Sequence, residues 1–454
     1  MQKKLLSGLF WVLLANLLVK PFWILGVEVG VQNAVGNEVY GFYFSIFNLS
    51  YILNILLDLG ITNFNTRNIA QHPQLIAKHL SGILGIKVCL LGLYLVATFT
   101  VGALMGYGSE EFRLLAWLTV CQFLSSLILY LRSNFEGLLL FKWDSLFSVL
   151  DRVLMILICG CLLWGPQFSL FHFQFTIYHF VYAQVIAYSL TVLLAFVVIA
   201  RKAKLSILHF HFSAPFFLVI LKKSAPFALL VLLMASYNRI DPILLRRLAG
   251  DADAGVYAGA FRLLDALTAV AYLVSVPLLP VFSKLCKEIK PANQDSLSKD
   301  SQLASIVRLV FWPMMIFAVG VSVVCAVWAE PIMQLLYHEN YAPYVPVFRV
   351  VIFGIIPIGI TYIFGTLLTA GKYLRHLNLF ATTTLVLNVI VNLVLIPRLG
   401  ATGSAWASLS AQSFMAVAQL ILATRLFRLP MAAFLPPSPH NIWKNITLLL
   451  KQQN

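Results

Sequence analysis

The sequence predicts an all-α integral membrane protein with about twelve transmembrane helices. Of the 454 residues, 60% are hydrophobic and only 11% are charged, and the mean hydropathy is +0.88. Soluble domains are about 45–50% apolar and about 25% charged. Runs of roughly 18 or more apolar residues, each long enough to cross a bilayer, recur along the whole chain. A soluble fold is therefore excluded.

The apolar runs give the order of the predicted spans. The first run is too long for the core of a cleaved signal peptide, and no small-residue cleavage site follows a short core, so it is predicted to be a span. The predicted spans lie near 5–30, 39–61, 81–105, 112–132, 144–165, 172–200, 221–247, 254–283, 304–329, 346–370, 376–396 and 402–424.

The distribution of basic residues predicts the orientation. The chain has 32 Lys and Arg against 17 Asp and Glu, a net charge of +15. If the amino terminus is cytoplasmic, most basic residues outside the spans fall in cytoplasmic segments, as the positive-inside rule requires. Both termini are then cytoplasmic. Nucleic acid is not an expected partner, because the charge is spread over many short loops. The outer loops hold only Arg113, Arg246, Arg247 and Arg398.

The longest segments between spans divide the chain into four predicted parts. Residues 1–200 form an amino-terminal lobe with spans one to six, and residues 221–430 form a carboxy-terminal lobe with spans seven to twelve. Residues 201–220 form a cytoplasmic linker with basic ends and apolar filling, which suits a segment lying in the membrane interface. Residues 431–454 form a cytoplasmic tail.

A short internal repeat supports the six-and-six division. The segment "GNEVYGFYFSIF" at 36–47 resembles "GDADAGVYAGAF" at 250–261, and both open an even-numbered span. Small residues in such segments let helices pack closely. At a constant separation, Gly36, Gly41, Tyr43 and Phe47 match Gly250, Gly255, Tyr257 and Phe261.

The charged residues deep inside the spans are the candidate site. These are Lys20, Arg239 and Arg262, together with the carboxylates Asp241 and Asp265. A charge at the middle of a bilayer costs at least about 2.5–3.5 kcal/mol and is usually placed against a partner or water. One interpretation is two structural ion pairs, Arg239 with Asp265 and Arg262 with Asp241. The other is a polar cavity that these groups line, and the two interpretations are compatible.

Other charges lie closer to the ends of the spans. Lys87, Arg152 and Arg349 are predicted to anchor in the interface, because long basic side chains extend their charge to water. Asp58 and Asp151 are candidate partners for a nearby basic residue.

Motifs for catalysis and for cofactors are absent from the sequence. It has no GxxxxGK[ST] phosphate loop, no HExxH and no paired-Cys metal spacing. No cofactor and no metal site are therefore expected. The outer Asp251-Ala-Asp253 lies in a loop too short for a catalytic site and is interpreted as a turn. We expect a protein that is not an enzyme.

Several stretches together carry a family resemblance. They are "VGNEVYGFYFSIFNLSYILNILLDLGITNFNTRNIA" (35–70), "FEGLLLFKWDSLFSVLDR" (135–152), "KKSAPFALL" (222–230), "YNRIDPILLRRLAGDADAGVYAGAFRLLDAL" (237–267), "LLYHENYAPYVPVFRV" (335–350) and "LNVIVNLVLIPRLGATGSAWAS" (387–408). Through them the chain resembles the Wzx-type flippases for lipid-linked oligosaccharides, part of the multidrug/oligosaccharidyl-lipid/polysaccharide exporter superfamily. Similar proteins often carry an Arg shortly before the first of these glycines, where this chain has Gln32, Asn33 and Ala34.

The resemblance implies two pseudo-symmetric six-helix lobes around a central cavity in the bacterial inner membrane. It implies alternating access, with an undecaprenyl-diphosphate-linked oligosaccharide moved from the cytoplasmic to the outer leaflet for O-antigen, capsule or exopolysaccharide. Its partners would be membrane lipid, a coupling H⁺ or Na⁺, and polysaccharide polymerase or assembly proteins. The diphosphate would bind Arg239, Arg262 and Lys20, because basic groups bind phosphate through charge-assisted hydrogen bonds, and Asp241 and Asp265 would hold those groups.

Three alternatives remain open at the level of sequence. A cation-coupled drug exporter of the same superfamily would favour unpaired carboxylates in its cavity. A membrane glycosyltransferase or polymerase would be expected to have a long outer loop, and the predicted outer loops are short. A scaffold of a polysaccharide assembly complex would not translocate substrate by itself.

Overall fold

The computed structural model describes most of the predicted spans. The described residues are 18–19, 21–165, 174–202, 228–275, 278–288, 296–430 and 434. Every regular element among them is a helix, which confirms the all-α prediction. The predicted linker lies outside the described residues from residue 203 onward, and the predicted tail does so except for residue 434.

Ten helices in the described part are long and apolar enough to cross a membrane. These ten helices correspond to the eleven predicted spans from the second to the twelfth. The last helix, α18 (Leu374–Leu426), contains two predicted spans, which are joined across a kink at Gly400. The described part of the first predicted span is the helical stretch that includes η1 (Trp23–Glu28) and α2 (Val29–Val35).

The chain divides into two compact units, Met1–Gly259 and Ala260–Asn454. The boundary falls inside α12 (Asp251–Ser275). Helix Ala228–Ala249 and the start of α12 belong to the first unit, because Ile243 and Ala258 are buried in its hydrophobic core. The predicted division into a lobe at 1–200 and a lobe at 221–430 stays a prediction.

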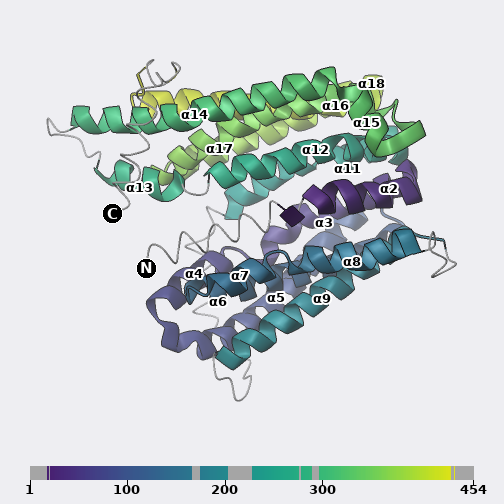
Figure 1. Cartoon of the computed structure of the whole chain (residues 1–454), viewed down its shortest axis with the longest axis horizontal. Helices are drawn as coiled ribbons and strands as arrows, with labels where there is room; N and C mark the ends of the chain where they lie inside the picture. The colour runs from purple at the N-terminus through teal and green to yellow at the C-terminus, as the bar shows by residue number, and fades with distance from the viewer. Residues whose placement is uncertain are drawn as a thin grey trace. The chain divides into compact units, whose positions relative to one another are not determined.

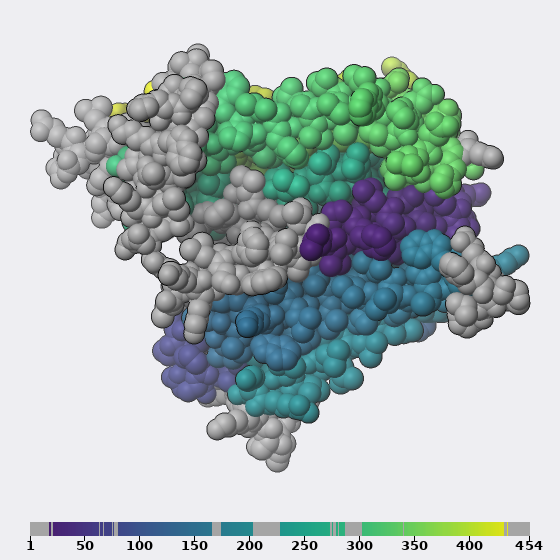
Figure 2. Space-filling view, in the orientation of Figure 1, coloured from purple at the N-terminus to yellow at the C-terminus, as the bar shows by residue number. Residues whose placement is uncertain are grey.

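The first unit is a bundle whose long helices are α3 (Asn37–Leu53), α5 (Ile76–Leu104), α6 (Ser109–Gly137), α8 (Leu150–Trp164) and α9 (Ile177–Lys202). Helix α9 packs on α6 and α8, and α3 packs on α6 and on α11 (Asp241–Ala249) (Figure 1). The contact of α2 with α8 is visible on the face drawn in Figure 2. Shorter elements join them, namely η2 (Asn54–Leu57), α4 (Ile61–Gln71), η3 (Pro73–Leu75) and α7 (Phe141–Phe147).

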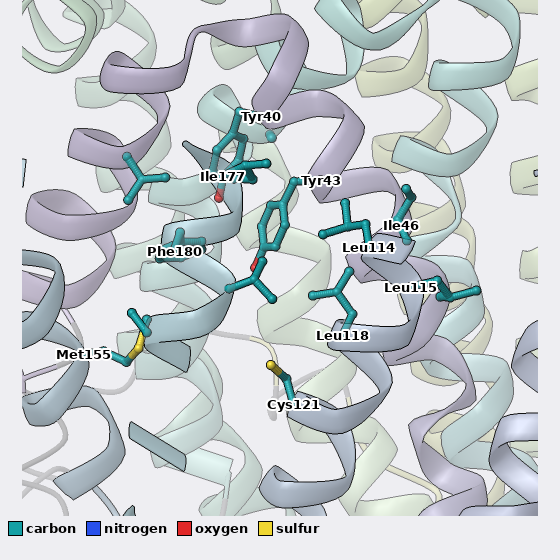
Figure 3. Packing of buried hydrophobic residues seen from close by; sticks show 14 of the residues in the cluster. Tyr40, Tyr43, Ile46, Leu114, Leu115, Leu118, Cys121, Met155, Ile177 and Phe180 are labelled. Carbon is teal, nitrogen blue, oxygen red and sulfur yellow. The ribbon is translucent and has the colours of Figure 1, made fainter. Parts of the chain in front are cut away.

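The core of this unit is centred on an aromatic residue of the predicted repeat. Tyr43 is 4% exposed, and its ring meets the edge of the Phe180 ring at 5.5 Å between centroids (Figure 3). Its hydroxyl accepts a hydrogen bond from Gln184 Nε2 at 3.0 Å, so the buried polar atom is satisfied. Apolar residues of α6, α8 and α9 surround the ring, among them Leu118 and Met155.

The second unit contains the rest of α12, α13 (Leu278–Glu288), α14 (Ser296–Val327), α15 (Ala329–Tyr337), η5 (His338–Asn340), α16 (Tyr344–Val351), η6 (Ile352–Gly354), α17 (Ile355–Ala370) and α18. Helix α17 packs on α13, α14 and α18 (Figure 1). A Cβ atom at Gly403 would overlap the carbonyl oxygen of Leu395, so the two parts of α18 on either side of Gly400 approach closely only with glycine there.

A buried lysine of α5 bonds to the backbone where the helix of the second predicted span is interrupted. After η2 the backbone of Leu59 and Gly60 is left-handed, with φ of 45° and 84°, before α4 begins. Lys87 of α5 is fully buried, and its Nζ donates at 2.8 Å to the Leu57 carbonyl, to Asp58 Oδ1 and to Ser126 Oγ. The predicted anchoring of Lys87 in the interface is therefore wrong, and the predicted role of Asp58 as an ion-pair partner is confirmed. Each of the three N–H groups of the Lys87 ammonium has an oxygen acceptor, so this charge is tolerated in the interior.

We predict that Lys87→Ala lowers the free energy of unfolding by about 3–5 kcal/mol, because it leaves a largely buried carboxylate without its counter-charge. Thermal melting of the purified protein in detergent measures this. Adding Asp58→Asn should recover part of the loss. The exposed Lys142 on α7 is the matched control, and Lys142→Ala should change the free energy by less than about 0.5 kcal/mol. Melting of Lys87→Ala at the wild-type temperature would contradict the structural role.

Candidate functional site

Arg239 lies inside the helix Ala228–Ala249 and contacts an aromatic ring of α3. Its guanidinium carbon is 5.5 Å from the centroid of the Tyr51 ring, which is the distance of a cation–π contact. The Arg239 side chain is half-buried, and Tyr51 is 43% exposed. A cation therefore lies next to a partly open aromatic surface within the first unit.

Asp241 lies two residues further on and makes a different contact. The helix bends at Ile240, and α11 begins at Asp241 with Pro242 in its first turn, as the missing donor of proline leads one to expect. Asp241 is fully buried, and its Oδ2 accepts a hydrogen bond from the Tyr257 hydroxyl at 3.2 Å. Arg239 and Asp241 thus have separate aromatic partners.

The other two predicted residues that the structure describes are in the second unit. Arg262 is 5% exposed and donates from Nη1 to the Tyr337 hydroxyl at 3.4 Å. The Tyr337 ring stacks on Tyr344 with centroids 4.0 Å apart and an interplanar angle of 5°. Asp265 is half-buried. Each deep Arg thus contacts tyrosine.

Three parts of the sequence hypothesis stay untested. Lys20 lies outside the described residues. The ion pairs expected between Arg239 and Asp265 and between Arg262 and Asp241 remain predictions, as does a substrate role for any of these five residues.

The two segments of the predicted repeat adopt the same backbone and cross each other within the first unit. Gly36 has φ 83° and ψ 167°, and Gly250 has φ 100° and ψ 176°; positive φ of this kind favours glycine. A Cβ atom at Gly41 would overlap the Asp251 carbonyl oxygen, and one at Gly255 would overlap the Asn37 carbonyl oxygen. We call this contact of α3 with the start of α12 the glycine crossing. Its reciprocal pattern supports a two-fold relation between the two segments.

Gln32 bonds to both segments of the glycine crossing. It is 1% exposed, and its Nε2 donates to the Gly255 carbonyl at 2.8 Å and to Asn37 Oδ1 at 3.0 Å. One side chain of α2 therefore bonds to both crossing segments, and a neutral amide does this without burying a charge.

Beside the glycine crossing, Arg246 joins three elements. Its Nη2 forms an ion pair with Glu111 Oε1 of α6 at 3.0 Å, and its Nε bonds to Asp251 of α12. The guanidinium also lies 4.7 Å from the Phe42 ring centroid and 5.9 Å from that of Tyr107. Burial raises the pKa of the Tyr107 hydroxyl, although the charge of Arg246 acts in the opposite direction. The sequence predicts that Arg246 lies in an outer loop and gives no sign of this cluster, because Glu111 lies far away in the chain.

A further basic residue lies among aromatic rings in the first unit. Arg152 Nη1 donates to Asp151 Oδ2 at 2.9 Å and to the Tyr188 hydroxyl at 2.8 Å, which confirms Asp151 as a partner of a nearby basic residue. Its guanidinium carbon lies 5.7 Å from the ring centroids of Trp23 and Tyr188. The charge of Arg152 is therefore balanced by Asp151 and surrounded by aromatic rings within the first unit.

A family model described as "Polysaccharide biosynthesis protein" matches residues 5–286, more than half of the chain. The chain therefore belongs to this family. No match was found among curated proteins.

Solved structures with the same fold are flippases and exporters. The lipid II flippase MurJ in an inward closed conformation has 16% identity, covers 97% of this chain and 91% of its own, and has a TM-score of 0.65. An inward-facing multidrug resistance MATE family transporter of the MOP superfamily has 15% identity, 92% and 94% coverage, and a TM-score of 0.63. A mutant of the Vibrio cholerae MATE transporter VcmN has 17% identity, 95% and 98% coverage, and a TM-score of 0.57. The fold is thus that of membrane flippases and transporters.

We predict that Gly41→Ala or Gly255→Ala opens the glycine crossing, because an added Cβ atom would meet backbone that cannot move aside cheaply. Overpacking of this kind costs roughly 1–3 kcal/mol. Ala258, which is 1% exposed next to the crossing, becomes the reporter as Ala258→Cys in a chain without native cysteines. Either glycine variant should raise its labelling rate by about tenfold.

The control for this prediction is Gly92→Ala in α5, because an added Cβ atom at Gly92 meets nothing within 4 Å. Gly92→Ala should leave the labelling of Ala258→Cys unchanged. Equal labelling in all three glycine variants would show that close approach at the crossing is not required.

Proposed function

We propose that this chain is a flippase for an undecaprenyl-diphosphate-linked oligosaccharide, which it moves from the cytoplasmic to the outer leaflet by alternating access. The observation that carries the proposal is the half-buried residue Arg239, whose guanidinium lies beside the ring of the partly exposed Tyr51 inside a membrane span. A charge there is costly in lipid, so a polar passage explains its presence. The family description and the fold of the lipid II flippase support this choice.

The proposed cargo combines groups that need different surroundings. Its diphosphate needs cations, and Arg239 and Arg262, with Lys20, supply them through charge-assisted hydrogen bonds. Its glycan needs polar and aromatic surfaces, whereas its lipid tail stays in the bilayer. Asp241 and Asp265 would position the basic groups or exchange a coupling H⁺ or Na⁺.

A cation-coupled exporter of drugs is the second candidate, because MATE transporters share the fold. An exporter of cations needs carboxylates that the cargo reaches. Asp241 is fully buried against the Tyr257 hydroxyl, and Asp265 is half-buried. The bases are arranged alike, since Arg262 is buried and Arg239 is half-buried. The choice of an anionic cargo is therefore supported by the family description.

The proposed setting is the bacterial inner membrane, with both termini in the cytoplasm, as the positive-inside rule predicts. The product would serve O-antigen, capsule or exopolysaccharide synthesis, and the partners would include polymerase or assembly proteins. The glycine crossing and the Arg246 cluster would then lie at the outer ends of α3, α6 and α12.

A deletion in the native host tests the proposed function. Complete lipid-linked oligosaccharide units should accumulate facing the cytoplasm. Units that lack one sugar would point to an enzyme instead, and an unchanged pool with altered drug sensitivity would point to an exporter.

We predict that Arg239→Ala and Arg262→Ala each reduce translocation by about ten- to a hundredfold at normal protein level, because each removes a charged hydrogen-bond donor worth about 1.5–3 kcal/mol. Surface polysaccharide in the complemented deletion strain measures this. Arg239→Lys should retain part of the activity. The exposed Arg425 is the control, and Arg425→Ala should behave as wild type. Normal polysaccharide in both deep variants would refute their role in the passage.

A further inference from the structure

We propose that Tyr51, supported by Phe47, is the surface that binds the first sugar of the cargo next to the diphosphate held by Arg239. This inference rests on the proposed function and extends it from the anionic group to the glycan. It assigns a site to two aromatic residues of α3.

The contacts of Tyr51 give it the geometry of a stacking surface. Its ring lies 6.1 Å from the Phe47 ring between centroids with an interplanar angle of 27°, so the two rings follow each other along α3. The helical spacing of four residues produces this row. Tyr51 is 43% exposed, so part of the residue is accessible beside Phe47 and Arg239.

A charged group lies next to the ring of Tyr51. The guanidinium carbon of Arg239 is 5.5 Å from the ring centroid, and Arg239 is a half-buried residue in a membrane span. A charged residue in a span is usually placed against water or a polar partner. The Tyr51 ring therefore lies beside a group that would bind the anionic part of the proposed cargo.

The chemistry of the cargo matches this pair of groups. In a polyprenyl-diphosphate glycan, a single bridging oxygen joins the diphosphate to the first sugar. A cation and an aromatic ring in direct contact can therefore engage both parts of one molecule. The apolar C–H face of a sugar ring packs on an aromatic face, and the tyrosine hydroxyl adds a hydrogen bond.

The proposed role predicts a difference between two ligands. The probes are undecaprenyl diphosphate and undecaprenyl diphosphate carrying one N-acetylhexosamine, and binding is measured with the full chain in nanodiscs. Tyr51→Leu should weaken binding of the glycosylated probe by between about threefold and about tenfold, relative to the bare diphosphate. Tyr51→Phe keeps the aromatic ring and should bind the glycosylated probe nearly as well as wild type. Arg239→Ala should weaken binding of both probes.

Trp117 of α6 is the matched control, since it is a 37% exposed aromatic side chain whose ring meets Tyr182 at 5.0 Å. Trp117→Leu should weaken neither probe. If Tyr51→Leu weakens both probes equally, or neither, the sugar site is overturned while the flippase function stands. If the wild-type chain binds neither probe, the proposed function fails, and the sugar site fails with it.

Discussion

The cost of placing charge inside a membrane constrains this molecule more than any other interaction. Each deep basic residue that the structure describes has aromatic or acidic neighbours that lower this cost. Lys87 is surrounded by three oxygen acceptors and is closed off, and Arg152 bonds to Asp151 and Tyr188. Arg239 differs, because it stacks on a ring that is itself partly exposed. Lys87 and Arg152 are thus held by oxygen atoms of the first unit, whereas the described contact of Arg239 is with an aromatic ring.

A second constraint is the close approach of two helices that carry the same short sequence. The glycine crossing requires two positive-φ glycines and two glycines without room for a Cβ atom. Gln32 and Arg246 bond across the same region with uncharged and charged groups respectively. These bonds connect α2 and α11 to α3, α6 and α12 within the first unit.

The sequence was most informative where the signal is local. Apolar runs predicted the spans, because crossing a bilayer requires a continuous apolar helix. The repeat was visible because its glycines are fixed by backbone conformation. The partners of Lys87 were not predictable, since one is a carbonyl freed by a break at Leu59 and Gly60. Arg246 was missed because Glu111 comes near it only in the folded chain, and Tyr51 because an aromatic residue in an apolar run carries no sign of its neighbour.

Transport by purified protein in vesicles shows directly whether the deep basic residues serve an anionic glycolipid. A labelled undecaprenyl-diphosphate oligosaccharide and a cationic dye are followed in parallel. We expect that the glycolipid crosses the bilayer, that the dye does not, and that Arg239→Ala slows the glycolipid. Transport of the dye with no movement of the glycolipid would rule out this role and assign the chain to cation export.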